Sequence, residues 1–451
     1  MYASNVLLSS GESRGKFPTW LTYGGVPPDG ERPAVHIQAS GFFGDGYGSR
    51  DSLPCLPLAE IEGVPLLFGK PTVERKENCL VVHADIIASA YFLLTRYEEW
   101  IRRDVRDEHG RFPGRESLPF RAGFLDRPIV DEYADLLRGW ADEMGIDLPP
   151  TKRTFSVLLT HDVDTLGQGI NLIQPFRSAV SALLGRQSWA RAFSTATAGL
   201  GLRRDPCNNL DDVIQMDRSL TGRFPAEKCS VVYFFMAGGN SRFDGAYNIH
   251  DALAREAMRC VKASGAGIGL HSSYAAGQRP ELIAQELRDL QQAAGTSVHQ
   301  NRHHFLALRE PEDIHALAAT GIDWDATLGY ADVAGFRLGV CRPIPLFDPI
   351  ERRLVGVEEH PLVVMDCSLD REKYMGLDEE AAFDHIQKLA DATARHGGEF
   401  VLLWHNTVLA TTDTSYHRRL YKNVLAYLGQ FIGEHSTSSA DFEKLYDLES
   451  N

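Results

Sequence analysis

The chain has 451 residues, 43% hydrophobic and 24% charged, which is an ordinary globular composition with enough length for two domains. Its formal net charge of −15 argues against nucleic acid as a partner, because phosphate backbones are bound by clustered basic residues. The first residues lack the pattern of a signal peptide, and no stretch is apolar enough to span a membrane, so we expect a cytoplasmic location. Seven scattered cysteines without a CxxC pair are typical of a reducing compartment.

The first 150 residues combine Gly- and Pro-rich segments with two helical patterns. Short apolar runs before residue 80 indicate strands and loops, and apolar residues recur at helical spacing over 84–104 and 127–144. The Pro149-Pro150 pair then interrupts the pattern. We therefore predict a small α+β N-terminal domain over residues 1–150.

From residue 151 to 451, short apolar runs alternate with helical patterns. The runs that indicate strands are 155–160, 230–237, 267–270, 321–325, 362–365 and 400–404. Helical patterns at 250–264, 280–293 and 379–396 lie between them. Alternation of strands and helices favours a parallel sheet or barrel, so the class predicted for this second domain is α/β.

A long insertion near residues 165–228 interrupts this alternation. Its first part, 165–204, contains neither acidic residues nor lysine but holds five arginines, Arg177, Arg186, Arg191, Arg203 and Arg204. In so acidic a chain this contrast has two interpretations. We favour a helical insertion that covers the barrel; the other interpretation is a lid or docking surface for an anionic substrate carrier or a membrane interface.

Chemically reactive side chains recur where the predicted strands end. The first strand ends in THDVD, with Asp162 and Asp164, and later segments read HSSY, RHHF and LLWH. Two carboxylates two residues apart point the same way in a strand and repel each other unless a cation is near. Each motif alone is better explained as a cap, a turn or a hydrogen-bonded histidine. Four of them at strand ends, which converge on one mouth in a β/α barrel, favour a metal-dependent hydrolase.

In this order the motifs resemble those of the polysaccharide deacetylases, the NodB-homology carbohydrate esterases. WDATLGYADVAGFRLG and EEHPLVVMDCSL are similar to later motifs of bacterial members, and RYEEW, DEHGRF and RPIVDEY to the accessory region of one subgroup. The resemblance implies a distorted (β/α) barrel of about seven strands over 151–451. It also implies a divalent metal ion, with zinc favoured, that activates water for hydrolysis of an N-acetyl amide.

The resemblance also implies roles for five motif residues. Asp162 matches the catalytic base and Arg302 the arginine that orients it. His405 matches the general acid for the leaving amine. Asp164 and His271 match metal ligands.

One ligand of the family pattern is missing. The position four residues after His271 holds Ala275, whereas catalytic zinc generally keeps three protein ligands. His304 stands where the family motif has proline, and we expect its imidazole to complete the site. His303 is a weaker substitute, and His161 is expected to face away.

Four further residues are candidates for substrate contacts: Tyr274, Asp325, Arg337 and Trp404. Tyr274 belongs to the HSSY motif, and Trp404 lies beside the predicted general acid. For Asp325 and Arg337 a structural ion pair is an equally good interpretation. For Trp404 core packing is the better one.

The predicted function is a metal-dependent deacetylase acting on an N-acetylated amino sugar in a glycan or glycan precursor. A lipid-linked substrate would be met by peripheral contact at the membrane surface. Two alternatives stay open. One is a non-catalytic glycan-binding or scaffold protein on a degenerate barrel, which Ala275 and the lost Arg-x-Pro-Tyr pattern support. The other is a hydrolase of a non-sugar C–N bond. The sequence predicts no oligomeric state.

Overall fold

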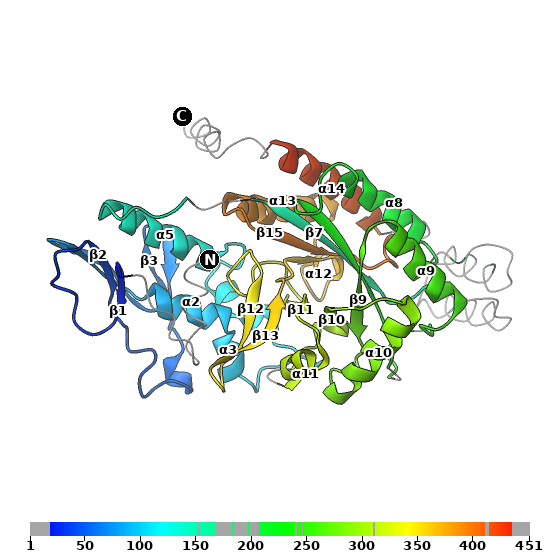
Figure 1. Cartoon of the computed structure of the whole chain (residues 1–451), viewed down its shortest axis with the longest axis horizontal. Coiled ribbons are helices and arrows are strands. Elements are labelled where there is room, and N and C mark those ends of the chain that lie inside the picture. The colour runs from blue at the N-terminus through cyan, green and yellow to red at the C-terminus, as the bar shows by residue number, and fades with distance from the viewer. Residues whose placement is uncertain are drawn as a thin grey trace.

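The computed structural model describes residues 19–150, 154–167, 205, 207–239, 241–245, 247–309, 312–410 and 415–434, together with Leu183 and Thr197. Figure 1 shows a smaller sheet at one end of the molecule and a larger, curled sheet with its helices at the other. The five arginines of the predicted insertion lie outside the described residues, so the role of that segment stays a prediction. Among the described residues, no helix is both long and apolar enough to cross a lipid bilayer.

The N-terminal region forms a four-stranded sheet in the order β1-β2-β6-β5 and a separate hairpin, β3-β4. The strands are β1 (Leu21–Tyr23), β2 (Ala34–Ile37), β3 (Ala59–Ile61), β4 (Val64–Leu66), β5 (Gly69–Lys76) and β6 (Cys79–Ala84). The helices are η1 (Arg50–Ser52), α2 (Ile86–Leu94), α3 (Tyr97–Ile101), η2 (Gly114–Glu116), α4 (Leu118–Arg121) and α5 (Ile129–Glu143). Both predicted helical patterns are confirmed. The first is divided at Arg96, whose φ of 51° is left-handed.

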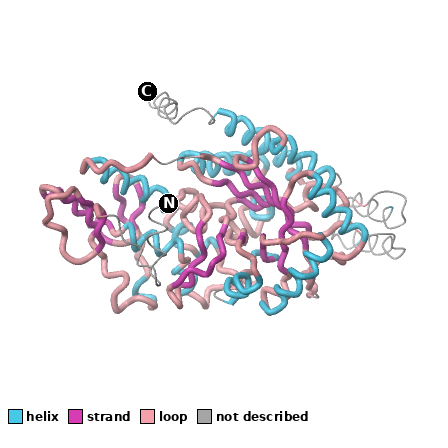
Figure 2. Tube along the Cα trace, in the orientation of Figure 1, coloured by secondary structure: helices cyan, strands magenta, loops and turns pink. Residues whose placement is uncertain are grey.

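Within the described residues, the second region forms a nine-stranded sheet in the order β12-β13-β11-β10-β9-β8-β7-β15-β14. The strands are β7 (Ser156–Val163), β8 (Cys229–Phe235), β9 (Gly267–Ser272), β10 (Gln300–His303), β11 (Trp324–Asp325), β12 (Ile344–Asp348), β13 (Arg353–Glu359), β14 (Val364–Met365) and β15 (Glu399–Leu403). Neighbours are parallel except in the β12–β13 hairpin. The protein is therefore mixed α/β, and the sheet curls into a half-barrel with β12 and β14 at its edges (Figure 2).

The strand count differs from the expected seven for a physical reason. All six predicted apolar runs contain a strand, but β10, with the sequence QNRH, is a buried strand of polar residues that hydrophobic periodicity does not reveal. The β12–β13 hairpin was not predicted either. A (β/α) barrel is compatible with this curled sheet, although its pairing order is that of an open sheet.

Helices cover the outer side of the curled sheet (Figure 1). Within the described residues, the helices of this region are α8 (Leu210–Thr221), α9 (Ala252–Ala263), η3 (Pro280–Leu282), α10 (Ile283–Ala294), η4 (His304–Leu306), α11 (Glu312–Thr320), α12 (Asp366–Asp370), α13 (Glu379–Arg395) and α14 (His417–Glu434). Two of them, η4 and α12, do not belong to this outer layer, since they follow β10 and β14 directly at the carboxyl edge of the sheet. The predicted patterns at 250–264, 280–293 and 379–396 are confirmed as α9, α10 and α13. Helix α9 shows why, since Ala254, Met258 and Val261 form one buried face at helical spacing.

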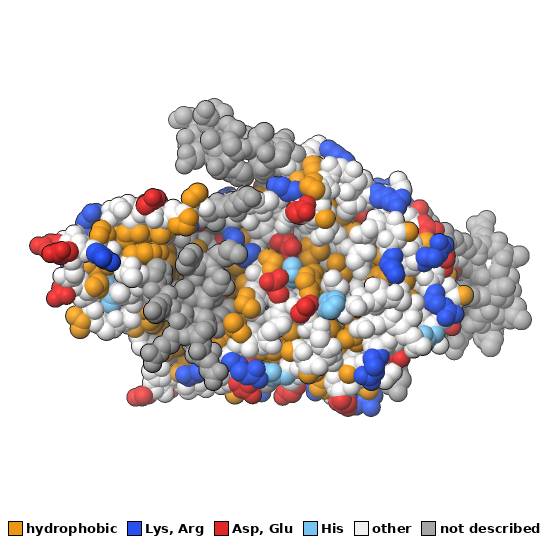
Figure 3. Space-filling model, in the orientation of Figure 1, with side chains coloured by type: hydrophobic (Ala, Val, Ile, Leu, Met, Phe, Trp, Pro, Cys, Tyr) orange, Lys and Arg blue, Asp and Glu red, His pale blue; other side chains and the backbone are white. Residues whose placement is uncertain are grey.

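The two regions share one hydrophobic core, which includes Val35 of β2 as well as Phe235 of β8 and Leu402 of β15. The backbone of the first region also lies close to side chains of the second. A Cβ atom at Gly114 would lie 2.5 Å from the side chain of Val333, so glycine is required there. The division into domains at residue 150 therefore stays a prediction. Figure 3 shows Asp, Glu and His side chains gathered near the middle of one face of the molecule.

Candidate metal centre and active site

Strand β7 delivers two aspartates to the carboxyl edge of the large sheet. Asp162 is the penultimate residue of the strand and Asp164 follows it directly. Both carboxylates approach His271 Nε2, with Asp162 Oδ2 at 3.6 Å and Asp164 Oδ1 at 3.4 Å. His161 points away from them, with its Nδ1 2.8 Å from the carbonyl oxygen of Trp404. The alternation of side chains along a strand explains this separation.

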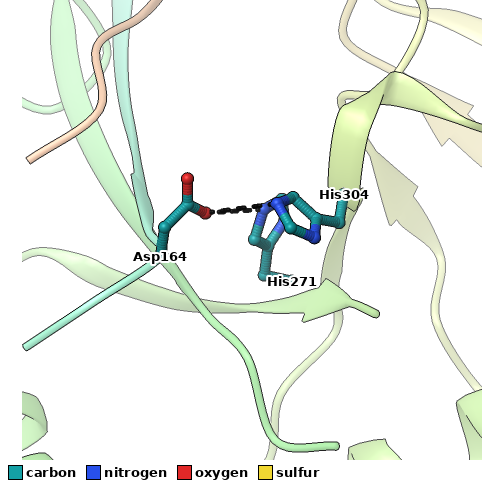
Figure 4. Close-up of side chains that lie close together, drawn as sticks. All are labelled: Asp164, His271 and His304. Atoms are coloured by element: carbon teal, nitrogen blue, oxygen red, sulfur yellow. Dashed lines mark ion pairs between the residues drawn. The ribbon is translucent and has the colours of Figure 1, made fainter. Parts of the chain in front are cut away.

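Asp164, His271 and His304 form a cluster in which the side chains point toward one another (Figure 4). One ligand atom from each lies within 4.8 Å of the others. Asp164 Oδ1 is 3.4 Å from His271 Nε2 and 3.7 Å from His304 Nε2. Two ligands of a tetrahedral zinc ion lie roughly 3.3–3.6 Å apart, given metal–ligand bonds of about 2.0–2.2 Å. The spacing therefore fits a divalent ion.

Unpartnered polar atoms mark the same point. Asp164 Oδ1 and His271 Nε2 are buried and have no hydrogen-bond partner within the described part of the chain. Buried polar atoms are normally hydrogen-bonded, so two such atoms facing each other indicate a ligand between them. His271 Nδ1 lies 2.9 Å from the carbonyl oxygen of Arg302 and must donate to it, which leaves the lone pair on Nε2. The Asp164 side chain is 29% exposed, so the cluster has an open side that water can reach.

His304 reaches the cluster from the end of β10. The resemblance implied that the missing ligand would lie after β9, at the position of Ala275. Ala275, at that expected position, is buried and carries no ligand atom. His304 Nδ1 faces Asp244 Oδ1 at 3.8 Å, and a carboxylate on this side of the ring leaves Nε2 directed toward Asp164. Sequence reasoning did not identify Asp244, because nothing in its local pattern distinguishes it from a turn aspartate.

The electrostatics of the cluster call for positive charge. Burial would raise the pKa of Asp164, but His271, His405 and His304 outweigh it and hold that pKa well below its usual value. Burial would lower the pKa of His271, but the carboxylates of Asp162 and Asp164 bring about a net increase. A divalent ion would supply positive charge next to these carboxylates while the imidazoles stay neutral.

Arg302 of β10 contacts Asp162 through Oδ1, the carboxylate oxygen other than the one that faces His271. Its fully buried guanidinium donates from Nη1 to Thr160 Oγ1 at 2.6 Å and to Asp162 Oδ1 at 3.3 Å. Nε donates to the carbonyl oxygen of Ala326 at 2.8 Å, and the group lies 4.8 Å from the ring centre of Phe234. The guanidinium therefore has a fixed position and compensates the charge of Asp162.

His405, which follows β15, lies on another side of Asp164. Its Nε2 is 3.9 Å from Asp164 Oδ2, while its Nδ1 is 2.8 Å from Asp366 Oδ1 and its backbone N–H donates to Asp366 Oδ2 at 2.7 Å. Burial would lower the pKa of His405, but the Asp366 carboxylate raises it well above its usual value. Conversely, burial raises the pKa of Asp366 but His405 lowers it to about 2. The Asp366 carboxylate thus orients the ring through Nδ1, and Nε2 is directed at the cluster.

In the part of the chain that the structure describes, two other groups could also hold a cation, Asp366–Cys367–His405 and His315–Asp348–Glu351. Both oxygens of Asp366 are already bonded to His405. Asp348 accepts the backbone N–H groups of Ile350 and Glu351 and pairs with His315. Because their carboxylates already have partners, neither group matches the unpartnered atoms of the Asp164 cluster.

The four predicted substrate-contact residues lie in different surroundings. The Tyr274 hydroxyl is 3.3 Å from His109 Nδ1. Buried Asp325 accepts the amide of Asn301 at 2.7 Å, and Arg337 pairs with Glu99 of the N-terminal region at 2.6 Å. Trp404 is fully buried against Tyr421. Asp325 and Arg337 thus have structural partners and Trp404 packs in the core, and the substrate roles of all four stay predictions. His303 is buried with its Nε2 3.8 Å from Asp313, and burial lowers its pKa to about 4.

Fold and site together describe an α/β protein with a candidate metal centre at the carboxyl edge of its large sheet. Residues 21–144 match a family of unknown function, DUF7033, which is less than half of the chain. A solved structure titled "Crystal structure of putative polysaccharide deacetylase from Mycobacterium smegmatis" is similar with 16% sequence identity and a TM-score of 0.39, covering 63% of this chain and 86% of that chain. No curated protein matches.

Proposed function

We propose that this protein is a metal-dependent hydrolase that removes the acetyl group from the nitrogen of an amino sugar. The observation that carries the proposal is the Asp164–His271–His304 cluster, in which Asp164 Oδ1 and His271 Nε2 have no hydrogen-bond partner among the described residues; it is flanked by Asp162, which pairs with Arg302, and by His405. A divalent ion, with zinc favoured, would lower the pKa of a water molecule toward about 7 and polarise the amide carbonyl.

Asp162 is the proposed general base. Its carboxylate borders the point on which the ligands converge, since Oδ2 lies 3.6 Å from His271 Nε2. A water molecule held there can give its proton to Asp162 as its oxygen attacks the amide carbon. Arg302 and Thr160 keep the carboxylate from turning away, because the same Nη1 atom contacts both.

His405 is the proposed general acid. An amine leaves an amide carbon only when it is protonated, so a proton must reach the nitrogen as the C–N bond breaks. His405 carries that proton on Nε2, and Asp366 fixes the ring by accepting from Nδ1. Base and acid lie beside different atoms of the cluster, so one bound amide group can contact both. The products are acetate and a free amine.

A non-catalytic scaffold is a poorer explanation of this geometry. Buried polar atoms without partners destabilise a fold, and a decayed site has no reason to keep them. Hydrolysis of a non-sugar C–N bond would use the same groups, so only substrates separate it from the proposal. The amino sugar, the glycan precursor, the lipid-linked carrier and the cytoplasmic location rest on the sequence motifs and composition.

The test is acetate release by the zinc- or cobalt-loaded full-length protein. We would compare N-acetylglucosamine oligomers with an N-acetyl amino acid, using wild type, His405→Ala and the surface control His299→Ala. We expect acetate from the sugar, a loss of about 10²–10³-fold in His405→Ala, and no change in His299→Ala. Release from the amino acid alone would favour the non-sugar hydrolase, and no release from either would favour the scaffold.

A further inference from the structure

A loop of the N-terminal region, residues 107–111, lies against the turn that carries His304. The loop is tightly closed, because Asp107 Oδ1 accepts the backbone N–H groups of His109 and Arg111, both at 2.9 Å. Gly110 has a φ of 79°, a left-handed conformation that suits glycine. The loop is therefore closed by hydrogen bonds among its own residues.

Arg111 connects this loop to the turn. Its Nη1 donates to the carbonyl oxygen of Phe305 at 2.8 Å, and its Nε donates to Asp107 Oδ2 at 2.8 Å. The side chain is only 9% exposed, and its Nη2 lies 3.3 Å from the Tyr374 hydroxyl. The guanidinium is thus fixed by Asp107 on one side and holds a backbone carbonyl on the other.

The turn that Arg111 holds is conformationally unusual. Phe305 and Leu306 have φ angles of 61° and 54°, so two successive residues with side chains are in the left-handed region directly after His304. Such conformations persist only where surrounding contacts enforce them. The bond to the Phe305 carbonyl is one of these contacts, and it comes from a residue 194 positions away.

A second contact comes from ring packing. The ring centre of His109 lies 4.6 Å from that of Phe305, and the ring centre of Phe305 lies 4.7 Å from that of His304. The His109 ring also packs edge-on against Tyr274 at 5.8 Å. The loop therefore contacts Phe305, the residue next to the candidate metal ligand His304, at both the backbone carbonyl and the ring of Phe305.

We propose that the 107–111 loop is part of the metal centre, with Arg111 as a positioning residue that sets the His304 imidazole through the Phe305–Leu306 turn. The inference rests on the proposed function. It gives a role to the region matched by the family of unknown function, which contains the loop. Without Arg111 the turn can relax, and His304 would spend less time in the binding orientation. Mutation of a group that orients a metal ligand typically lowers metal affinity about 10–100-fold.

The experiment measures the zinc dissociation constant of the full chain by competition with a chromophoric chelator. Wild type is compared with Arg111→Ala and with Arg115→Ala. Arg115 is a matched control, because its side chain also joins the N-terminal region to the rest of the chain, through the carbonyl oxygen of Tyr374, without touching the turn. We expect affinity to fall about 10–100-fold in Arg111→Ala and to stay near wild type in Arg115→Ala.

A double-mutant cycle separates positioning from general loosening. In a His304→Ala background, Arg111→Ala should weaken zinc binding no further, and the cobalt absorption spectra of the two His304→Ala proteins should coincide. Arg111→Lys should regain part of the affinity. If Arg111→Ala does not fold, the same cycle is run with Arg111→Lys against Arg115→Lys.

Wild-type affinity in a folded Arg111 variant would overturn the inference, and so would equal losses in the Arg111 and Arg115 variants or additive losses with His304→Ala. Each of these results leaves the proposed function intact. A wild-type protein that binds no zinc would instead overturn the proposed function, and this inference with it.

Discussion

Aspartate and histidine side chains lie on both sides of strand β7, but they differ in whether their polar atoms are hydrogen-bonded within the protein. On one side, His161 contacts the Trp404 carbonyl and Asp217, and Asp217 accepts the hydroxyl groups of Tyr233 and Tyr421. We call these four side chains, His161, Asp217, Tyr233 and Tyr421, the saturated cluster. On the other side, the Asp164–His271–His304 cluster contains buried atoms that have no hydrogen-bond partner among the described residues. The hydrogen bonds of the saturated cluster are complete within the protein, whereas those of the metal cluster are not.

Residue identity alone therefore does not define the site. His161 and Asp162 are adjacent in sequence and both are buried, yet only Asp162 faces the cluster with unpartnered atoms. What distinguishes the two sides is whether the polar atoms already form hydrogen bonds within the protein. Polar atoms that do not are available to bind a ligand.

The largest expected effect is on catalysis. Asp162→Asn keeps the size of the side chain but removes the proposed base, so turnover should fall about 10³-fold or more. Zinc content should be unchanged, because Asp162 is not one of the three proposed ligands. Acetate release and elemental analysis of one preparation check both points. Turnover within a few-fold of wild type would assign the base elsewhere.

The next effect concerns the acid. Asp366→Asn removes the carboxylate that fixes the His405 ring, so turnover should fall about 10²-fold while zinc content is retained. Cys367→Ser is a neighbouring control outside the proposed mechanism and should have a much smaller effect. If Asp366→Asn lost its zinc instead, Asp366 would be a metal ligand and the assignment of the clusters would be wrong.

A third prediction compares stability on the two sides of β7. Asp217→Asn should lower the free energy of unfolding by about 2 kcal/mol, since it replaces a charged acceptor of two buried hydroxyl groups. Asp164→Asn in metal-free protein should cause a smaller loss, because Asp164 Oδ1 has no hydrogen bond to lose among the described residues and only the attraction of the nearby imidazoles is removed. Denaturant unfolding of both variants in chelator tests the contrast. Equal losses would mean that the two clusters do not differ in kind.

The smallest expected effect extends the comparison to an ion-paired histidine outside both clusters. Burial would lower the pKa of His360, but Glu358 and Glu399 raise it to about 9. The folded pKa thus exceeds the unfolded value of about 6.5, so the stabilisation is fully present below pH 6.5 and is lost as pH rises through 9. The loss should be on the order of 1–2 kcal/mol. His360→Gln should flatten this part of the stability profile, and an unchanged slope would assign it to other groups.

Much of the fold was predictable because its signals are local. The apolar runs of β7, β8 and β15 and the amphipathic faces of α9, α10 and α13 stand out in the sequence. Strand β10 does not, because Asn301, Arg302 and His303 are polar residues, and the burial of Asn301 and Arg302 is offset by distant partners. Tertiary contacts, rather than periodicity, make that segment a strand.

The candidate site divides in the same way. The positions of Asp162, Asp164, His271 and His405 follow from strand ends that meet at one edge. Asp366 was visible only as a carboxylate near a strand end, since its partner His405 is 39 positions away. The contribution of Arg111 was not predictable at all, because it depends on a single bond to a backbone carbonyl 194 positions away.

The central claim is that Asp164, His271 and His304 bind a divalent metal ion. The most direct measurement is elemental analysis of the purified protein after exposure to zinc or cobalt, with Asp164→Ala, His304→Ala and Asp217→Asn in parallel. We expect about one ion per chain in wild type and in folded Asp217→Asn, none in Asp164→Ala, and a large reduction in His304→Ala. A wild-type chain that stays metal-free, or an Asp164→Ala chain that keeps its metal, would contradict it.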